Sequence, residues 1–65
     1  MGEQMNDAII KITIDSFIDI QRAMLKAKKE HASETYEELH FQYISHKAAL
    51  NTLGVNLSEI DLIKE

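Results

Sequence analysis

Residues 36–53, YEELHFQYISHKAALNTL, decide how this chain folds. Five apolar or aromatic residues and one histidine recur in this stretch at spacings of 3, 4, 3, 4 and 3: Tyr36, Leu39, Tyr43, His46, Leu50 and Leu53. These are the a and d positions of a heptad repeat, which line one side of an α-helix. The stretch therefore predicts a helix that packs lengthwise, through this seam, against another helix.

Signals at both ends place this helix at about residues 33–53. Ser33 is a favourable N-cap residue, because its hydroxyl can accept a hydrogen bond from a free backbone N–H of the first turn. Gly54 suits the left-handed backbone position that commonly ends a helix. Away from the seam, the same helix carries a second apolar patch, formed by Phe41, Ile44 and Ala48.

A first helix is predicted at about residues 6–30. On a helical wheel its charged residues fall on one side: Lys11, Asp15, Asp19, Arg22, Lys26 and Lys29. The remainder is occupied by Met5, Ile9, Ile10, Ile14, Phe17, Ile18, Ile20, Met24 and Leu25. This apolar arc spans about 200°, whereas a surface helix needs a stripe of only about 100°. The helix must therefore be covered from two directions.

Residues 8–14 also permit a second interpretation, a β-strand. The run IKITID at residues 10–15 alternates apolar and polar residues, and β-branched residues dominate it. A strand over residues 8–14 would end before Ser16, which could then cap a shorter helix.

A short strand followed by two helices resembles the ribbon-helix-helix family of DNA-binding regulators, whose members dimerise through that strand. The resemblance implies that three isoleucines point inward: Ile10, Ile12 and Ile14. It implies that their neighbours face the major groove: Lys11, Thr13 and Asp15. The chain departs from the family at residues 30–32, where Glu-His-Ala replaces the usual turn of small residues. This resemblance implies the alternative function, a transcriptional regulator.

The tail of the chain predicts a short helix at about residues 56–64. Asn56 and Glu59 have the spacing of a capping box, with Asn in place of Ser or Thr. The apolar residues that follow are Leu57, Ile60, Leu62 and Ile63. This segment either folds back over an open end of the helical hairpin or docks onto a partner.

Length and charge limit the function. A chain of 65 residues forms one domain, residues 1–65, and a folded chain of this size buries only about 60% of its unfolded surface. With no Cys to form disulfides, self-association is the expected source of further stability. The net charge of -4 argues against nucleic-acid or membrane-surface binding. The N-terminus lacks a basic region before its apolar run, and no stretch has 18 apolar residues, so we expect a cytoplasmic protein.

The histidines indicate no metal site and no cofactor. His31, His40 and His46 include no pair at i, i+4, and only Glu37 and His40 share the Glu-x-x-His spacing of di-iron bundles. No nucleophile pairs with a base, so no catalytic residue is expected and the chain is not expected to be an enzyme. His46 is expected either to be half-buried and hydrogen-bonded to a side chain or water or, since imidazole titrates near neutral pH, to fix the register or sense pH.

The sequence thus predicts an all-α fold: an antiparallel helical hairpin with a short C-terminal helix, paired with a second copy into a four-helix bundle. The expected function is that of a small non-enzymatic protein-interaction or regulatory module. The expected partners are a second copy and another protein, and neither nucleic acid nor a membrane. Its predicted core and interface residues are Ile10, Ile14, Phe17, Ile20, Met24, Tyr36, Leu39, Phe41, Tyr43, Ile44, His46, Leu50 and Leu53.

Overall fold

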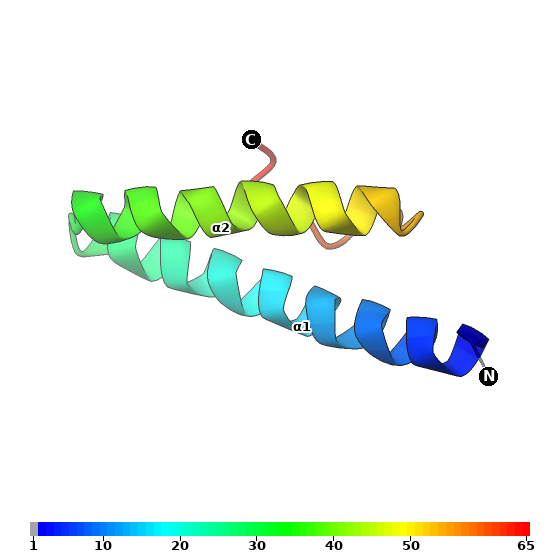
Figure 1. Ribbon diagram of the computed structural model, residues 1–65. Coiled ribbons are helices and arrows are strands. Elements are labelled where there is room, and N and C mark those ends of the chain that lie inside the picture. The colour runs from blue at the N-terminus through cyan, green and yellow to red at the C-terminus, as the bar shows by residue number, and fades with distance from the viewer. Residues whose placement is uncertain (1) are drawn as a thin grey trace.

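The computed structural model describes the backbone of residues 2–65 and the side chains of residues 7–65. Two helices, α1 (Gly2–Lys29) and α2 (Ser33–Thr52), run antiparallel and pack against each other (Figure 1). Figure 1 also shows that α1 is the longer helix and that its N-terminal part diverges from α2 and continues past the end of α2. The predicted all-helical hairpin is confirmed for this part of the chain.

The strand alternative is wrong, because residues 8–14 lie within α1. The β-branched Thr13 is accommodated in the helix, where its hydroxyl donates to the Ile9 carbonyl oxygen at 2.7 Å. The isoleucines of this stretch do not share one face: Ile14 packs against the core while Ile12 is 65% exposed. The ribbon-helix-helix fold, which needs these side chains on one face of a strand, is therefore excluded.

Helix α1 begins at Gly2, earlier than the predicted start at about residue 6. Met5, which the helical wheel places on the apolar side, lies outside the described side chains. None of the helical segments described for this chain is long and apolar enough to cross a membrane.

The core joins both helices and the tail, by which we mean residues 55–65. From α1 it contains Phe17, Ile20 and Met24, and from α2 it contains Tyr43 and Leu50. The rings of Phe17 and Tyr43 stack with centroids 5.4 Å apart. The tail contributes partly buried apolar side chains that pack against this cluster: Val55, Leu57, Ile60 and Ile63. The tail is therefore part of the fold rather than an appendage.

The turn between the helices is built on His31. The N–H of His31 donates to the Lys28 carbonyl at 3.2 Å, and the N–H of Ala32 donates to the Ala27 carbonyl at 2.8 Å. This pair of bonds is the Schellman motif, whose first residue past the helix cap takes a left-handed conformation. His31 has φ of 59°, in the region where a side chain with a Cβ costs about 1–2 kcal/mol.

Replacing His31 with Gly is therefore expected to raise the free energy of unfolding by about 1 kcal/mol. His31 is exposed, so the substitution removes strain with little loss of packing. Urea denaturation followed by circular dichroism measures the effect. Ala32→Gly is the matched control, because Ala32 has φ of -87° and relieves no strain. A less stable His31→Gly protein would show that the imidazole has contacts that outweigh the strain.

Helix α2 differs slightly from its predicted start. Ser33 is not the N-cap: Ala32 holds that position, makes no side-chain capping bond, and accepts the Tyr36 N–H on its carbonyl at 2.9 Å. The tight turn leads directly into the helix, so Ser33 already has helical geometry. At the other end Gly54 has φ of 82°, the left-handed conformation that its position predicted, and the N–H of Val55 donates to the Leu50 carbonyl at 3.0 Å.

The predicted C-terminal helix over residues 56–64 is wrong, since the tail forms only one turn. Asn56 does cap this turn, with its side-chain oxygen accepting the Ser58 N–H at 3.0 Å, and the N–H of Asp61 donates to the Leu57 carbonyl at 2.8 Å. Beyond Asp61 the backbone N–H groups donate to side chains of the hairpin and of the tail instead of to the carbonyl oxygens of preceding residues, so the helix does not continue. In Figure 1 the tail crosses behind α2, and its end emerges beside the middle of that helix.

Candidate functional site

Gln21 joins α1 to the tail and is fully buried. Its Nε2 donates to the Ile60 carbonyl at 2.7 Å, while its Oε1 accepts the N–H groups of Leu62 and Ile63, the latter at 2.9 Å. One buried amide thus satisfies three backbone groups that would otherwise end a turn unpaired. The side chain of Gln21 therefore determines where the tail leaves its turn and how it lies on α1.

Asp61 joins the tail to α2 in the same way. Its Oδ1 accepts the Tyr43 hydroxyl at 2.6 Å and the Lys64 N–H at 2.8 Å, and its Oδ2 lies 3.0 Å from Lys47 Nζ. The Tyr43 hydroxyl in turn accepts the Glu65 N–H at 2.9 Å. Each buried polar group of the described side chains has a partner. We call Gln21, Tyr43, Lys47 and Asp61 the tail-anchoring network.

The pKa values of this network follow from its geometry. Burial alone raises the pKa of Asp61, but hydrogen bonds from Tyr43, the Lys64 N–H and Lys47 outweigh burial and hold that pKa below its usual value. The hydrogen bond to Asp61 raises the pKa of Lys47. Burial and the hydrogen bond to Asp61 raise the pKa of Tyr43. The folded chain thus favours a charged Asp61 and Lys47 and a neutral Tyr43.

A pH dependence of stability follows from Asp61. Because its folded pKa is depressed, its contribution to stability is complete above the unfolded pKa of about 3.9 and is lost as pH falls through the folded value. Thermal unfolding between neutral pH and pH 2 is expected to show this loss in the acid range below about pH 4. Asp61→Asn should be less stable at neutral pH and should lose less on acidification. If the unfolding midpoints of the wild type and Asp61→Asn fall in parallel as pH is lowered, the titration of Asp61 does not contribute to the acid dependence of stability.

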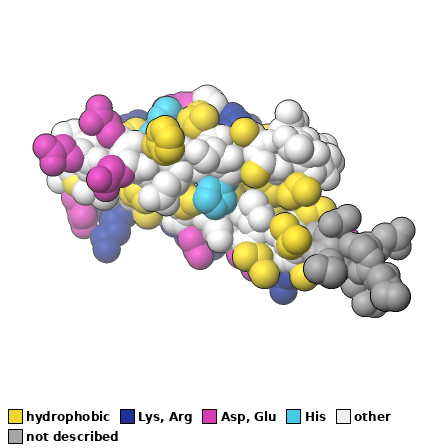
Figure 2. Space-filling model, in the orientation of Figure 1, with side chains coloured by type: hydrophobic (Ala, Val, Ile, Leu, Met, Phe, Trp, Pro, Cys, Tyr) yellow, Lys and Arg dark blue, Asp and Glu magenta, His cyan; other side chains and the backbone are white. Residues whose placement is uncertain are grey.

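Apart from this network, the described chain leaves much apolar surface exposed. The large apolar side chains that are 39–74% exposed are Ile9, Ile12, Leu25, Phe41, Ile44, Leu53 and Leu62. Figure 2 shows hydrophobic side chains gathered on one face of α1, next to the residues drawn in grey, and acidic side chains gathered where α2 begins. Contiguous apolar surface on a soluble protein commonly marks an interaction site.

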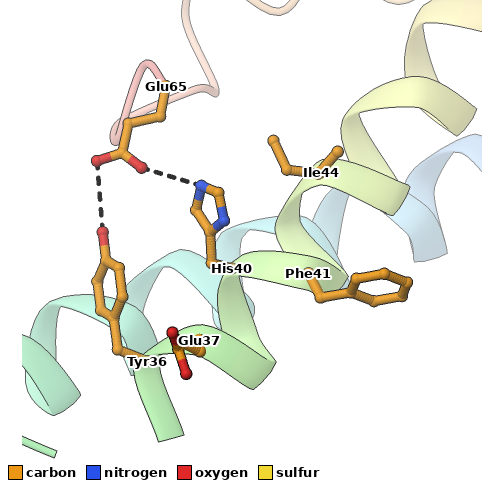
Figure 3. Close-up of a pocket in the computed structure, with 6 residues that line it drawn as sticks. All are labelled: Tyr36, Glu37, His40, Phe41, Ile44 and Glu65. Carbon is orange, nitrogen blue, oxygen red and sulfur yellow. Dashed lines mark hydrogen bonds and ion pairs between the residues drawn. The ribbon is translucent and has the colours of Figure 1, made fainter. Parts of the chain in front are cut away.

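One such surface is an open groove of about 430 Å³ beside α2, which we call the Phe41 groove (Figure 3). Its lining residues are Tyr36, Glu37, His40, Phe41, Ile44 and Glu65. The tail builds one wall, because the Glu65 carboxylate lies 3.0 Å from His40 Nε2 and accepts the Tyr36 hydroxyl at 3.5 Å. Figure 3 shows the Phe41 ring pointing away from this pair, and the residue is 74% exposed. The groove thus combines acidic and apolar groups.

Glu37 and His40, the pair with the Glu-x-x-His spacing, both line this groove. His40 is paired with Glu65, and Glu37 is exposed. Over the described residues, no three His, Asp or Glu side chains gather as metal ligands would. The Glu-x-x-His spacing therefore has no third ligand within the part of the chain that the structure describes.

His46 lies half-buried on α2, with its Nδ1 donating to the Gln42 carbonyl at 2.9 Å in the tautomer that carries the proton there. This bond stays within the helix and does not cross to α1. His46 is thus half-buried as expected, but its hydrogen bond goes to a backbone carbonyl of its own helix instead of to a side chain or water. A role in register or pH sensing stays a prediction.

The structure divides the thirteen predicted core and interface residues into three groups. Buried are Phe17, Ile20, Met24, Tyr43 and Leu50. Partly buried are Ile10, Ile14, Tyr36, Leu39 and His46. Exposed are Phe41, Ile44 and Leu53, so within one chain these three have no core role.

Sequence reasoning placed Tyr43 in the core but missed the other three members of the tail-anchoring network, Gln21, Lys47 and Asp61. Gln21 follows Phe17 by four residues and precedes Met24 by three, so its place on the apolar side was a usable signal of burial. Asp61 likewise sits between Ile60 and Leu62 in an apolar run. A polar residue on a buried face needs a hydrogen-bonding partner, which the helical wheel does not reveal.

Comparisons of the chain with protein-family models, curated protein sequences and solved structures find no match.

Proposed function

We propose that this chain is a non-enzymatic protein-interaction module that acts as a homodimer, with two hairpins forming a four-helix bundle. The observation that carries the proposal is the set of exposed large apolar side chains, which persists after the tail has covered one side of the hairpin. A stable dimer would cover part of this surface and present the rest to another protein in a regulatory role.

The energy of burial supports self-association. Covering about 600 Å² of apolar surface yields up to about 15 kcal/mol at about 25 cal/mol per Å², an upper bound before the costs of association. A domain of this size has a stability of only about 5 kcal/mol or less from its own core. The free energy available from dimerisation is therefore large enough to decide whether the folded state is populated.

A DNA-binding role has less support. It depended on a strand over residues 8–14, which is helical, and the net charge of -4 opposes phosphate binding.

The midpoint of thermal unfolding should rise with protein concentration, because unfolding of a dimer releases two chains and mass action favours the dimer at higher concentration. Circular dichroism over a hundredfold range of concentration, about 1–100 µM, measures this dependence. A monomer unfolds at the same temperature throughout. A midpoint that is independent of concentration would contradict the proposal.

A further inference from the structure

The acidic side of the Phe41 groove has a defined pattern. Glu37 and Glu38 precede Phe41 by four and three residues, which places both beside Phe41 on the surface of α2. Glu37 lines the groove, and Glu38 lies next to Phe41 without lining it. Both glutamates are exposed, and Ile44, one turn further along, is 44% exposed. Phe41 is thus an exposed aromatic residue beside two free carboxylates, with a third carboxylate, that of Glu65, in the groove wall.

The opposite pattern surrounds Leu25 on α1. Leu25 is 50% exposed, and it is flanked by Arg22 three residues before it, and by Lys28 and Lys29 three and four residues after it. All three basic residues are exposed. We call these four residues the Leu25 patch. Lys28 lines a hollow that Glu37 of the same chain also lines, but none of the three basic side chains forms an ion pair among the described residues.

We propose that two copies of this chain pair by placing the Leu25 patch of each in the Phe41 groove of the other. This inference rests on the self-association proposed above and names the surfaces that meet. Each surface offers a large apolar side chain, and the charges around it are opposite in sign. In a two-fold dimer this contact is made twice, because the patch of each copy meets the groove of the other.

Charge complementarity favours a second copy over other occupants. The chain carries a net charge of -4, so two copies repel each other unless basic residues of one meet acidic residues of the other. The Leu25 patch and the Phe41 groove provide this match within one sequence. The main rival is the apolar surface at Ile9 and Ile12, which has fewer charges and would pair without regard to charge sign.

Charge exchange tests the pairing. One variant carries Glu37→Lys and Glu38→Lys, and the other carries Arg22→Glu and Lys29→Glu, all at exposed positions. Each variant alone places like charges at both contacts of its dimer. The dissociation constant of that dimer should therefore rise by about tenfold or more. An equimolar mixture restores opposite charges at both contacts, because one contact is native and the other has its charges exchanged. Sedimentation equilibrium should find monomers for each variant alone and a dimer for the mixture.

The possible outcomes separate this inference from the function on which it rests. A wild-type dimer with two variants that dimerise equally well would overturn the pairing but leave self-association standing. A monomeric wild type would overturn both. Ile12→Glu is the matched control on the rival surface and should leave dimerisation unchanged. If Ile12→Glu is monomeric while the two charge variants still dimerise, the interface lies at Ile12 instead. Circular dichroism of each variant checks that its helices are formed, and recovery in the mixture excludes misfolding as the cause of dissociation.

Discussion

Replacing Phe17 with alanine is expected to lower the free energy of unfolding by about 3–5 kcal/mol, enough to unfold a domain of this size. Phe17 is fully buried, and its ring stacks on that of Tyr43 at 5.4 Å. Removing the ring leaves a cavity between α1 and α2 that the surrounding helices cannot fill. Leu50→Ala, at the other fully buried end of the core, is expected to cost about 2–5 kcal/mol.

Lys11→Ala is the control for both core variants, because Lys11 lies on the charged side of α1 and is exposed. Its free energy of unfolding should stay within about 0.5 kcal/mol of the wild-type value. Urea denaturation gives all four values under the same conditions. Equal losses for Phe17→Ala and Lys11→Ala would mean that α1 is rotated relative to the arrangement described.

Replacing Gln21 with leucine is expected to release the tail while leaving the two helices paired. Leucine fills similar volume but cannot bond to the Ile60 carbonyl or to the N–H groups of Leu62 and Ile63. These three bonds are partly buried, and a backbone group that loses its partner away from water costs about 1–3 kcal/mol. In the Gln21→Leu variant, the three losses together are therefore expected to outweigh the packing that holds the tail in place.

Hydrogen exchange measured by NMR tests this expectation at the residues concerned. The amides of Leu62 and Ile63 should lose protection in Gln21→Leu, whereas amides in the middle of α2 should keep most of theirs. Gln42→Leu is the matched control, because it is the same substitution at an exposed position of α2, away from the tail. Retained protection at both tail amides would show that Gln21 does not hold the tail.

The hairpin was predictable because its determinants are local and periodic. The 3–4 spacing from Tyr36 to Leu50 identifies the packed side of α2 without knowledge of its partner, whereas Leu53, the last residue of the predicted seam, is exposed beyond the end of the helix. The same holds for Gly54, whose left-handed backbone depends on its immediate neighbours. The exposed Phe41 and Ile44 were also recognisable, since their distance from the seam on the helix is fixed by helical geometry.

The tail was not predictable in this way, because its conformation depends on residues far away in sequence. Gln21 bonds to backbone groups about forty positions along the chain, and those bonds replace the ones that would continue a helix beyond Asp61. The alternation in residues 10–15 indicated a strand, but this segment is helical, and the described residues contain no strand with which it could pair. The Phe41 groove, whose wall includes Glu65, could be described only once the path of the tail was known.

Sedimentation equilibrium of the wild-type chain at micromolar concentration tests the central claim, self-association, most directly. A dimer has twice the 7.4 kDa mass of the single chain, and the fitted mass should approach that value as the concentration rises. A fitted mass that stays at 7.4 kDa over the whole concentration range would contradict self-association and, with it, the pairing of the Leu25 patch with the Phe41 groove.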